Sequence, residues 1–390
     1  MRMKILWITP WFGNYRIAVY AQLSKISTEN FYLICSQRDT SKLVQQKLNT
    51  SLGDHAFIMS GSGDICFGNH DSDFANTGLV IRRQKGLYKA IKAINADLII
   101  VEGFGGWAPF GIWYAIFHHK KILIFYERTA YVERNSPWWR TLYRKIVGRF
   151  AAGFLINGTL THQYLKQLGF GKYPMVEGCM VADSDELKKS VEQMNGAAKK
   201  QLKDQLNISP SGLVFLFVGQ LVERKGIKQL LSAWETHIKE FPTDTLLVVG
   251  TGILYDALYE QYKTEPTIKI LGAVDYSLIH RYYAIASVFV MPTLEDNWSL
   301  VVPEAMACGL PVATTLYNGC YVELIKDGEN GYVFDAYDRN NVIEVLAKFH
   351  SADLSSMGKR SLDIVKEYTP EIAAHKIYDL CVRVLQESKS

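Results

Sequence analysis

The sequence has 390 residues, of which 48% are hydrophobic and 21% are charged, and its formal net charge is +4. This is an ordinary globular composition, and the length suits two domains better than one. The mild positive charge favours anionic ligands or an acidic membrane surface, and it excludes the strongly basic pattern of a nucleic-acid-binding chain.

The cysteines and the apolar runs favour a cytoplasmic protein. The six cysteines are scattered and include no C-x-x-C pair, so we expect neither a zinc site nor a disulfide framework. The apolar run at the start is too short for a signal peptide. No run of about 18 apolar residues predicts a membrane span.

The first half alternates short apolar runs with longer amphipathic stretches, which predicts a parallel α/β sheet. We expect helices over 16–27 and 87–94, and loops with one short strand pair over 38–80, where Ser, Gly, Asn and Asp are frequent. The expected strands are 5–9, 31–35, 98–101, 122–126 and 153–157.

A second alternation begins near residue 212 and predicts a second sheet. We therefore expect an α/β protein with a first Rossmann-like domain over 1–184, a linker over 185–210 and a second such domain over 211–369, facing each other across a central cleft. A final helix near 370–390 is expected to pack back onto the first domain. The expected strands of the second domain are 214–218, 246–249, 268–271, 288–291, 312–314 and 331–334.

Ligands of such sheets bind beyond the carboxyl ends of the strands, where several distinctive residues fall. Gly219 opens a turn that contains Arg224 and Lys225, and this basic pair could neutralise a diphosphate. Gly250 follows the next strand, and Leu271 ends the third, where backbone groups could meet a nucleobase. Taken alone, the basic pair could equally be a solvated surface, and the glycines could be simple turns.

The most informative segment is 292–312, which places Asp296 and Glu304 eight residues apart across a polar turn. A helix is expected from residue 301, so free backbone N–H groups before it could face a polar ligand. Asp296 alone could be a helix N-cap or a loop acid. Together with the basic pair, however, the two acids indicate a nucleotide-sugar site. The amides concerned belong to Trp298, Ser299, Leu300 and Val301.

Over residues 214–335 the sequence resembles the GT-B retaining glycosyltransferases of glycosyltransferase family 4 (glycosyl transferases group 1). The resemblance rests on the basic residue before Lys225-Gly226, on an E-x7-E-like pair and on Glu-Ala-Met-Ala-x-Gly-x-Pro-Val ending at residue 312. It is weaker in the first half. Asp296 replaces the first glutamate of the pair, so either Asp296 or its neighbour Glu295 could meet the sugar. Gln220 stands where many members carry arginine, and Ser299 replaces a glycine.

The resemblance implies transfer of a sugar from a nucleotide-diphosphate sugar, with retention of anomeric configuration and without a metal or other cofactor. Glu304 would accept the ribose hydroxyls, and Asp296, Asn297 and the following amides would hold the donor sugar. Arg224 and Lys225 would stabilise the charge that develops on the departing diphosphate.

The first domain is expected to bring the acceptor, with Gly13 of its first turn touching the donor. Many relatives carry a histidine where this chain has Tyr126-Glu127, so Glu127 is the candidate to contact the sugar or the acceptor. Alternatively, Glu127 is a carboxylate salt-bridged to Arg128 or Arg134. The remaining acceptor-binding candidates, at the ends of strands, are Asn14, Tyr15, Arg16, Glu102 and Arg128.

Residues 138–150 are basic, aromatic and helical in period, as expected of a helix that rests in a membrane interface. The alternative is an amphipathic helix that packs on its own sheet with a solvated basic face. If the segment contacts the inner face of a membrane, the acceptor would be a lipid-linked saccharide, and otherwise a free saccharide. Either would suit the synthesis of bacterial surface polysaccharide.

Two other classes of function fit parts of the sequence. Residues 103–108 satisfy G-x-G-x-x-A after a strand, and Glu127 ends the next strand, as in an NAD-dependent oxidoreductase, although Trp107 would crowd a pyrophosphate. A non-catalytic sugar-nucleotide-binding scaffold is the other alternative. The acidic triplets 71–73 and 183–185 mimic the metal-binding D-x-D of a different glycosyltransferase fold.

Overall fold

The computed structural model describes residues 3–10, 14–38, 40–68, 74–75 and 78–387. The chain divides into two units, one formed by Met1–Val181 with Tyr368–Ser390 and the other by Ala182–Glu367.

The first unit contains a seven-stranded sheet in the order β3-β2-β1-β6-β7-β8-β9, and all its strand pairs are parallel. Its strands are β1 (Ile5–Thr9), β2 (Phe31–Ser36), β3 (Ala56–Met59), β6 (Leu98–Glu102), β7 (Lys121–Tyr126), β8 (Gly153–Ile156) and β9 (Met175–Val176). Its helices are η1 (Asn14–Arg16), α1 (Ile17–Ile26), α2 (Lys42–Leu52), η2 (Gly53–His55), α3 (Leu87–Ile94), α4 (Ala108–Phe117), α5 (Trp138–Val147), η3 (Gly148–Phe150), α6 (Thr159–Gln167) and α16 (Pro370–Gln386).

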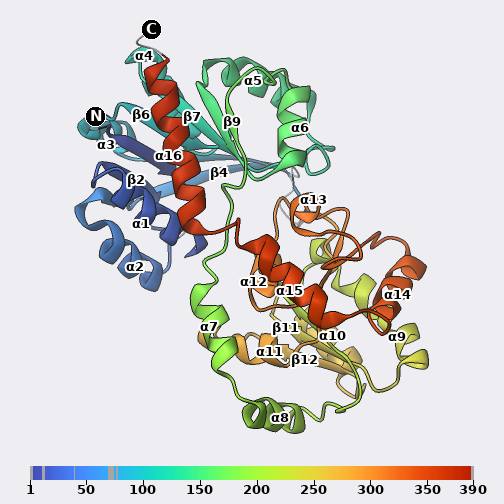
Figure 1. Cartoon of the computed structure of the whole chain (residues 1–390). Coiled ribbons are helices and arrows are strands. Elements are labelled where there is room, and N and C mark those ends of the chain that lie inside the picture. The colour runs from blue at the N-terminus through green and yellow to red at the C-terminus, as the bar shows by residue number, and fades with distance from the viewer. Residues whose placement is uncertain (1–2, 11–13, 39, 69–73, 76–77, 388–390) are drawn as a thin grey trace. The chain divides into compact units, whose positions relative to one another are not determined.

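Both faces of this sheet are covered, which explains why its strands are continuous apolar runs. Ile5 and Trp7 of β1 point into one hydrophobic cluster, and Leu6 and Ile8 point into the other, because successive strand residues face opposite sides. Helices α1, α2 and α16 cover the first face, and α3, α4 and α6 cover the second. The last helix, α16, therefore belongs to the core of the first unit and lies along α1 (Figure 1).

Part of the expectation for residues 38–80 was wrong. Residues 42–52 form the helix α2, because its buried residues Val44, Leu48 and Leu52 recur at every fourth position and so share one face. The polar composition of this segment had suggested a loop. Ser41 caps this helix by accepting a hydrogen bond from the Val44 amide. A strand pair is present, as β4 (Ser62–Gly68) pairs antiparallel with β5 (Gly78–Gln84).

The second unit contains a six-stranded parallel sheet in the order β12-β11-β10-β13-β14-β15. Its strands are β10 (Val214–Val218), β11 (Thr245–Val249), β12 (Ile268–Gly272), β13 (Val288–Met291), β14 (Val312–Thr315) and β15 (Gly331–Phe334). Its helices are α7 (Asp185–Gln193), α8 (Gly196–Gln205), η4 (Glu223–Lys225), α9 (Ile227–Glu240), α10 (Tyr255–Tyr262), η5 (Tyr276–Leu278), α11 (His280–Ile285), α12 (Val301–Ala307), α13 (Tyr321–Leu324), α14 (Arg339–Lys348) and α15 (Leu354–Val365).

This strand order is that of the Rossmann fold, in which the chain reverses direction across the sheet between the first and fourth strands. Here the reversal lies between β10 and β13, which are neighbours in the sheet. Residues 185–210, expected as a linker, include α7 and α8, and both helices pack against α11 of the second unit.

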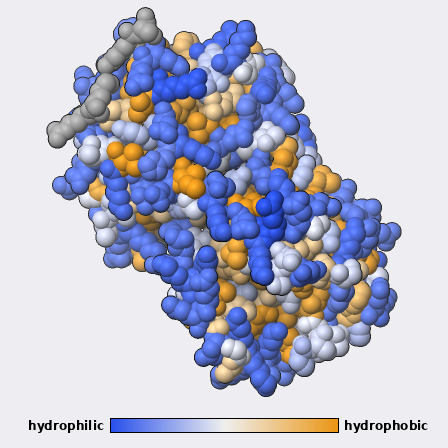
Figure 2. Space-filling view, viewed as in Figure 1, coloured by the Kyte–Doolittle hydropathy of each residue, from blue (hydrophilic) through white to orange (hydrophobic). Residues whose placement is uncertain are grey.

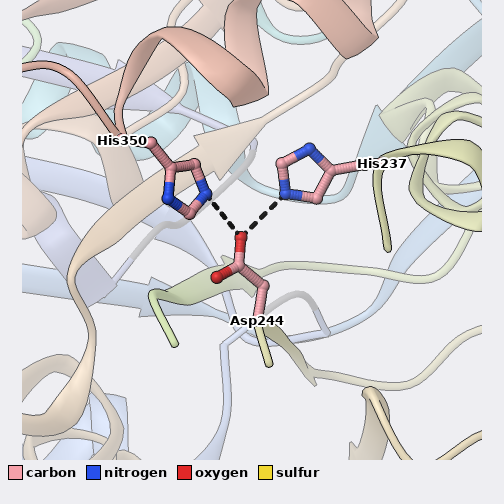
Figure 3. Close-up of side chains that lie close together, drawn as sticks. All are labelled: His237, Asp244 and His350. Atoms are coloured by element: carbon pink, nitrogen blue, oxygen red, sulfur yellow. Dashed lines mark hydrogen bonds and ion pairs between the residues drawn. The ribbon is translucent and has the colours of Figure 1, made fainter. Parts of the chain in front are cut away.

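A buried carboxylate ties three parts of the second unit together near the amino ends of its strands. Asp244, which precedes β11, accepts hydrogen bonds on Oδ2 from Nε2 of His237 and Nε2 of His350, each at 2.8 Å (Figure 3). Its Oδ1 atom accepts the Leu213 amide at 2.8 Å. The cluster thus joins α9, the end of α14 and the start of β10.

The surface seen in Figure 2 is mostly hydrophilic, with hydrophobic side chains scattered among polar ones. Within the described part of the chain, no helix is both long and apolar enough to cross a bilayer. Large hydrophobic side chains are nevertheless exposed on α4 and α5.

Replacement of Asp244 by alanine should lower the free energy of unfolding by about 3 kcal/mol, because it leaves buried donors without an acceptor. Chemical denaturation would measure the change. Asp256→Ala, at an exposed position of α10, is the control. A loss no larger than that of the control would show that the cluster does not stabilise the unit.

Candidate active site

Two loops meet where the second sheet reverses direction. The loop after β10 contains η4, and the loop after β13 leads to α12. Gly226 has a left-handed backbone (φ +69°), and a Cβ atom there would lie 1.9 Å from the carbonyl oxygen of Pro292. The Leu294 amide donates to the Arg224 carbonyl at 2.8 Å. Gly226 is therefore required for the contact between the loops.

This contact brings the predicted basic pair to Asp296. Lys225 Nζ forms an ion pair with Asp296 Oδ2, and Arg224 Nη1 lies 3.9 Å from the same oxygen. The Ser299 hydroxyl also donates to this oxygen, at 2.7 Å. Three of the sequence-predicted residues, from two loops about 70 positions apart, thus surround one carboxylate.

The local charges keep Asp296 ionised. Burial acts to raise the pKa of this carboxyl group, but the Lys225 charge and the hydrogen bonds from Lys225 and Ser299 outweigh it, so the pKa lies below its usual value. A charged carboxylate accepts hydrogen bonds strongly. Asp296 therefore suits the binding of sugar hydroxyl groups.

The expectation of four free amides before α12 was wrong for two of them. The Trp298 amide donates to Asp296 Oδ1 at 3.2 Å, and the Ser299 amide donates to Asn318 Oδ1 at the same distance. Leu300 and Val301 make no backbone N–H hydrogen bond within the described residues. Two of the four predicted amide donors therefore form hydrogen bonds that stabilise the turn.

Glu304, in the first turn of α12, is held by two tyrosines. Tyr276 donates to Oε1 at 3.2 Å, and Tyr283 donates to Oε2 at 3.4 Å. Burial raises the pKa of Glu304 to about 7, and the two hydrogen bonds lower it only in part. Glu304 therefore changes charge near neutral pH.

The other predicted donor-binding residues of this unit lie around the same strand ends. Gly219 follows β10, and Leu271 lies in β12. Gly250 follows β11 with φ +140°, and a Cβ atom there would meet the Gly219 carbonyl oxygen at 1.8 Å, so the glycine is required by the neighbouring strand. Glu295 is buried, whereas Asn297 is half-buried and its Oδ1 atom has no hydrogen-bond partner among the described residues.

In the first unit, the predicted residues form one buried network. Arg16 forms ion pairs with both Glu102 and Glu127. Glu102 also accepts from Trp7 Nε1 at 3.0 Å and from the Thr9 hydroxyl at 2.7 Å. Because β1 and β6 are adjacent, these residues lie where the first sheet reverses direction.

Glu127 is salt-bridged, and its partner Arg16 was not among the partners expected for it. Arg128 Nη1 instead lies 3.1 Å from Glu133 Oε1. Burial raises the pKa of Tyr15, beside Arg16, to about 12. Asn14 begins η1, and Gly13 lies outside the described residues.

The structure also places the competing motifs. In the G-x-G-x-x-A turn, Trp107 is fully buried, and a Cβ atom at Gly106 would lie 2.9 Å from Pro10. Glu127, the ribose acid of that hypothesis, is paired with Arg16. Of the acidic triplets, 183–185 leads into α7, with Ser184 at its N-cap. The triplet at 71–73 lies outside the described residues.

Among the described residues, the side chains close enough together to hold a metal ion are His237, Asp244 and His350. Their 2.8 Å separations are hydrogen-bond distances. Asp244 precedes its strand, whereas Lys225 and Asp296 follow theirs. The cluster therefore lies at the opposite end of the sheet from the predicted donor residues, and hydrogen bonding accounts for its geometry.

Comparison with known proteins agrees with this geometry. Residues 198–361 match the family described as glycosyl transferases group 1. This part of the chain is therefore similar to that family. The matched residues include the loops after β10 and β13 and the segment from Asp296 to Glu304.

Two curated relatives extend the comparison. The chain is 25% identical over 190 residues to alpha-monoglucosyldiacylglycerol synthase of Acholeplasma laidlawii, covering 48% of each protein. It thus spans about half the length of that relative. It is 21% identical to an uncharacterised 41.2 kDa protein in the cps region of Klebsiella pneumoniae, over 76% of this chain and 83% of that protein.

A solved structure shows the fold of the whole chain. The Anabaena protein Alr3699/HepE, in complex with UDP, superimposes with a TM-score of 0.74 at 14% sequence identity, covering 98% of this chain and 100% of that one. The fold of this chain is therefore GT-B, an α/β fold with two Rossmann-like units. The central cleft between the units stays a prediction.

Some residues of the site were not identified from sequence. Tyr276 and Tyr283 hold Glu304, and buried Asn318 holds the Ser299 amide. None of them belongs to a recognisable motif. Tyr276 follows a strand end, as the predicted residues do, and this position is the one signal that could have pointed to it.

The raised pKa of Glu304 predicts a pH-dependent stability difference. Its folded pKa of about 7 exceeds the value of about 4.3 in the unfolded chain. As the pH rises from about 4 to about 7, the unfolded state releases this proton first, so the wild type should lose up to about 3.7 kcal/mol relative to Glu304→Gln. Above about pH 7 the difference should be constant.

Urea denaturation across this pH range would measure the difference. Glu192→Gln, at an exposed position of α7, is the control and should follow the wild type. If wild type and Glu304→Gln had parallel stability profiles, Glu304 would have an ordinary pKa.

Proposed function

We propose that this chain is a retaining glycosyltransferase that transfers a sugar from a nucleotide-diphosphate sugar to an acceptor hydroxyl group. The observation that carries the proposal is the convergence of Arg224, Lys225 and Asp296 where the second sheet reverses direction, which is where such sheets bind nucleotides. Glu304 follows Asp296 in the same segment and lies in the first turn of α12.

The donor would be held by opposite charges at its two ends. The ammonium group of Lys225 and the guanidinium group of Arg224 would bind the diphosphate. Asp296 would accept hydrogen bonds from the transferred sugar, with the Leu300 and Val301 amides nearby. Glu304 would accept from the ribose hydroxyls, which suits its ionised form.

The basic pair would also act in the chemical step. As the glycosidic bond to the diphosphate breaks, negative charge grows on the departing oxygen, and nearby positive side chains stabilise it more strongly than in the ground state. In this proposal Arg224 and Lys225 supply that charge, so no metal ion or other cofactor is required. Retention of anomeric configuration follows from the family resemblance.

The first unit would bind the acceptor. Glu102 already accepts from Trp7, Thr9 and Arg16 and is about 10% exposed, whereas the Glu127 side chain is 26% exposed. Both carboxylates face the guanidinium group of Arg16. Glu127 is therefore the acceptor-binding candidate that an incoming hydroxyl group could reach, and Arg16 would position it.

We further propose that the acceptor is a lipid-linked saccharide at an anionic membrane surface. Helix α5 exposes Trp138, Trp139, Leu142 and Ile146, beside exposed Lys145, in a pattern typical of interfacial helices. Arg144 does not join this face, because it is buried and pairs with Glu133 at 2.7 Å.

Helix α4 adds a second apolar stripe, since Phe110, Trp113 and Phe117 are exposed on its surface. The α5 residue Tyr143 donates to the Phe104 carbonyl at 3.1 Å, just before α4, so the two helices are tied together. Two of the relatives point the same way, one named as a synthase of a glucosyldiacylglycerol and the other encoded in a cps region. A role in bacterial surface polysaccharide synthesis is part of this proposal.

A thermal-shift screen against UDP-, GDP- and ADP-sugars should identify the donor, since a ligand at a hundredfold excess over its dissociation constant stabilises by about 2.7 kcal/mol. With that donor, Lys225→Ala should lower kcat by about 10²–10³-fold, because one transition-state charge is lost. Lys228→Ala, an exposed lysine of α9, is the control.

Binding of the donor without transfer or hydrolysis would identify a scaffold, and binding of NAD(H) instead would identify an oxidoreductase. Equal activity of Lys225→Ala and the wild type would contradict the proposed role of the basic pair. Chelation of divalent metals should leave transfer unchanged, and the product should keep the anomeric configuration of the donor.

Vesicle co-sedimentation tests the membrane contact. The chain should bind phosphatidylcholine vesicles that contain phosphatidylglycerol, and binding should weaken with added salt. Trp138→Ala should reduce binding by about tenfold, because a large apolar side chain no longer enters the interface. Ile253→Ala, at a more exposed apolar position in the second unit, should have no effect. Equal loss in both variants, or no vesicle binding, would contradict the contact.

A further inference from the structure

We infer that Tyr276 is a displaceable gate on the nucleoside-binding carboxylate: its hydroxyl group occupies Glu304 until the ribose of the donor replaces it. The inference rests on the proposed function, and it concerns two hydrogen bonds, one from Tyr276 to Oε1 and one from Tyr283 to Oε2. Both oxygens of the carboxylate that would bind the ribose diol are therefore already occupied in the structure.

The two tyrosines differ in how firmly they are held. Tyr283, in α11, is 1% exposed, and its ring packs against Phe289 of β13 with centroids 6.1 Å apart. Its hydrogen bond comes from within the core, so it can orient Glu304 but cannot move away without unpacking the helix. Tyr283 is therefore a positioning residue.

Tyr276 is held far more loosely. Its side chain is 57% exposed, and it begins the three-residue helix η5. This turn is capped by Asp275, whose Oδ1 atom accepts from the Ser277 amide and hydroxyl group. Because the cap holds the backbone without help from the tyrosine ring, the side chain can rotate away while the turn stays in place.

The position of Tyr276 also fits this role. It follows β12 by four residues, beyond the carboxyl end of the strand where Leu271 was predicted to meet the nucleobase. A ribose that binds Glu304 Oε1 would therefore meet the hydroxyl group of this side chain. Occupation by the phenol also keeps the buried carboxylate hydrogen-bonded while no donor is present.

Removal of each hydroxyl group should change the affinity for a nucleoside diphosphate in the opposite direction. Tyr276→Phe keeps the ring and removes the competing donor, so a nucleoside diphosphate should bind about fivefold more tightly, as expected when one hydrogen bond no longer has to be broken. Tyr283→Phe removes the orienting hydrogen bond, so the same ligand should bind more weakly.

Isothermal titration with UDP, GDP and ADP, at about pH 8 where Glu304 is ionised, would measure both effects. Tyr259→Phe, an exposed tyrosine of α10, is the control. Unchanged or weaker binding by Tyr276→Phe, while the wild type binds, would overturn the gate alone. Absence of binding by the wild type to all three would overturn the proposed function, and the gate with it.

Discussion

The chemistry of the second unit depends on the contact between two loops where its sheet reverses direction. A side chain at Gly226 would collide with the Pro292 carbonyl, and the Arg224 carbonyl accepts the Leu294 amide. These backbone contacts place Lys225 against Asp296 before any ligand arrives. Because the positions of the charges are set by the backbone, little reorganisation would be needed if a diphosphate bound there as proposed.

In both units the charged residues lie where the sheet reverses direction, but the combination of charges differs. In the second, two cations share one carboxylate, so the site is net positive and suits a diphosphate. In the first, the guanidinium group of Arg16 faces two carboxylates, Glu102 and Glu127, and carboxylates can accept hydrogen bonds from hydroxyl groups. This division of charge matches a donor in one unit and an acceptor in the other.

Much of this fold could be predicted from the sequence because the patterns that predict its strands and helices lie within short segments. The strands β10 and β13 begin and end where the apolar runs predicted, and the helix α12 begins at the predicted residue. Helix α2 was missed because most of its surface is polar. The pairing of Arg16 with Glu127 and the use of the Ser299 amide by Asn318 join distant positions, and no local pattern records such contacts.

The most direct test is a structure of the chain with a nucleoside diphosphate bound. It should show the phosphates on Arg224 and Lys225 and the ribose on Glu304, with the Tyr276 hydroxyl group moved away. A nucleotide bound at the 103–108 turn, or one that left Lys225 paired with Asp296 and made no contact with either basic residue, would contradict this mechanism.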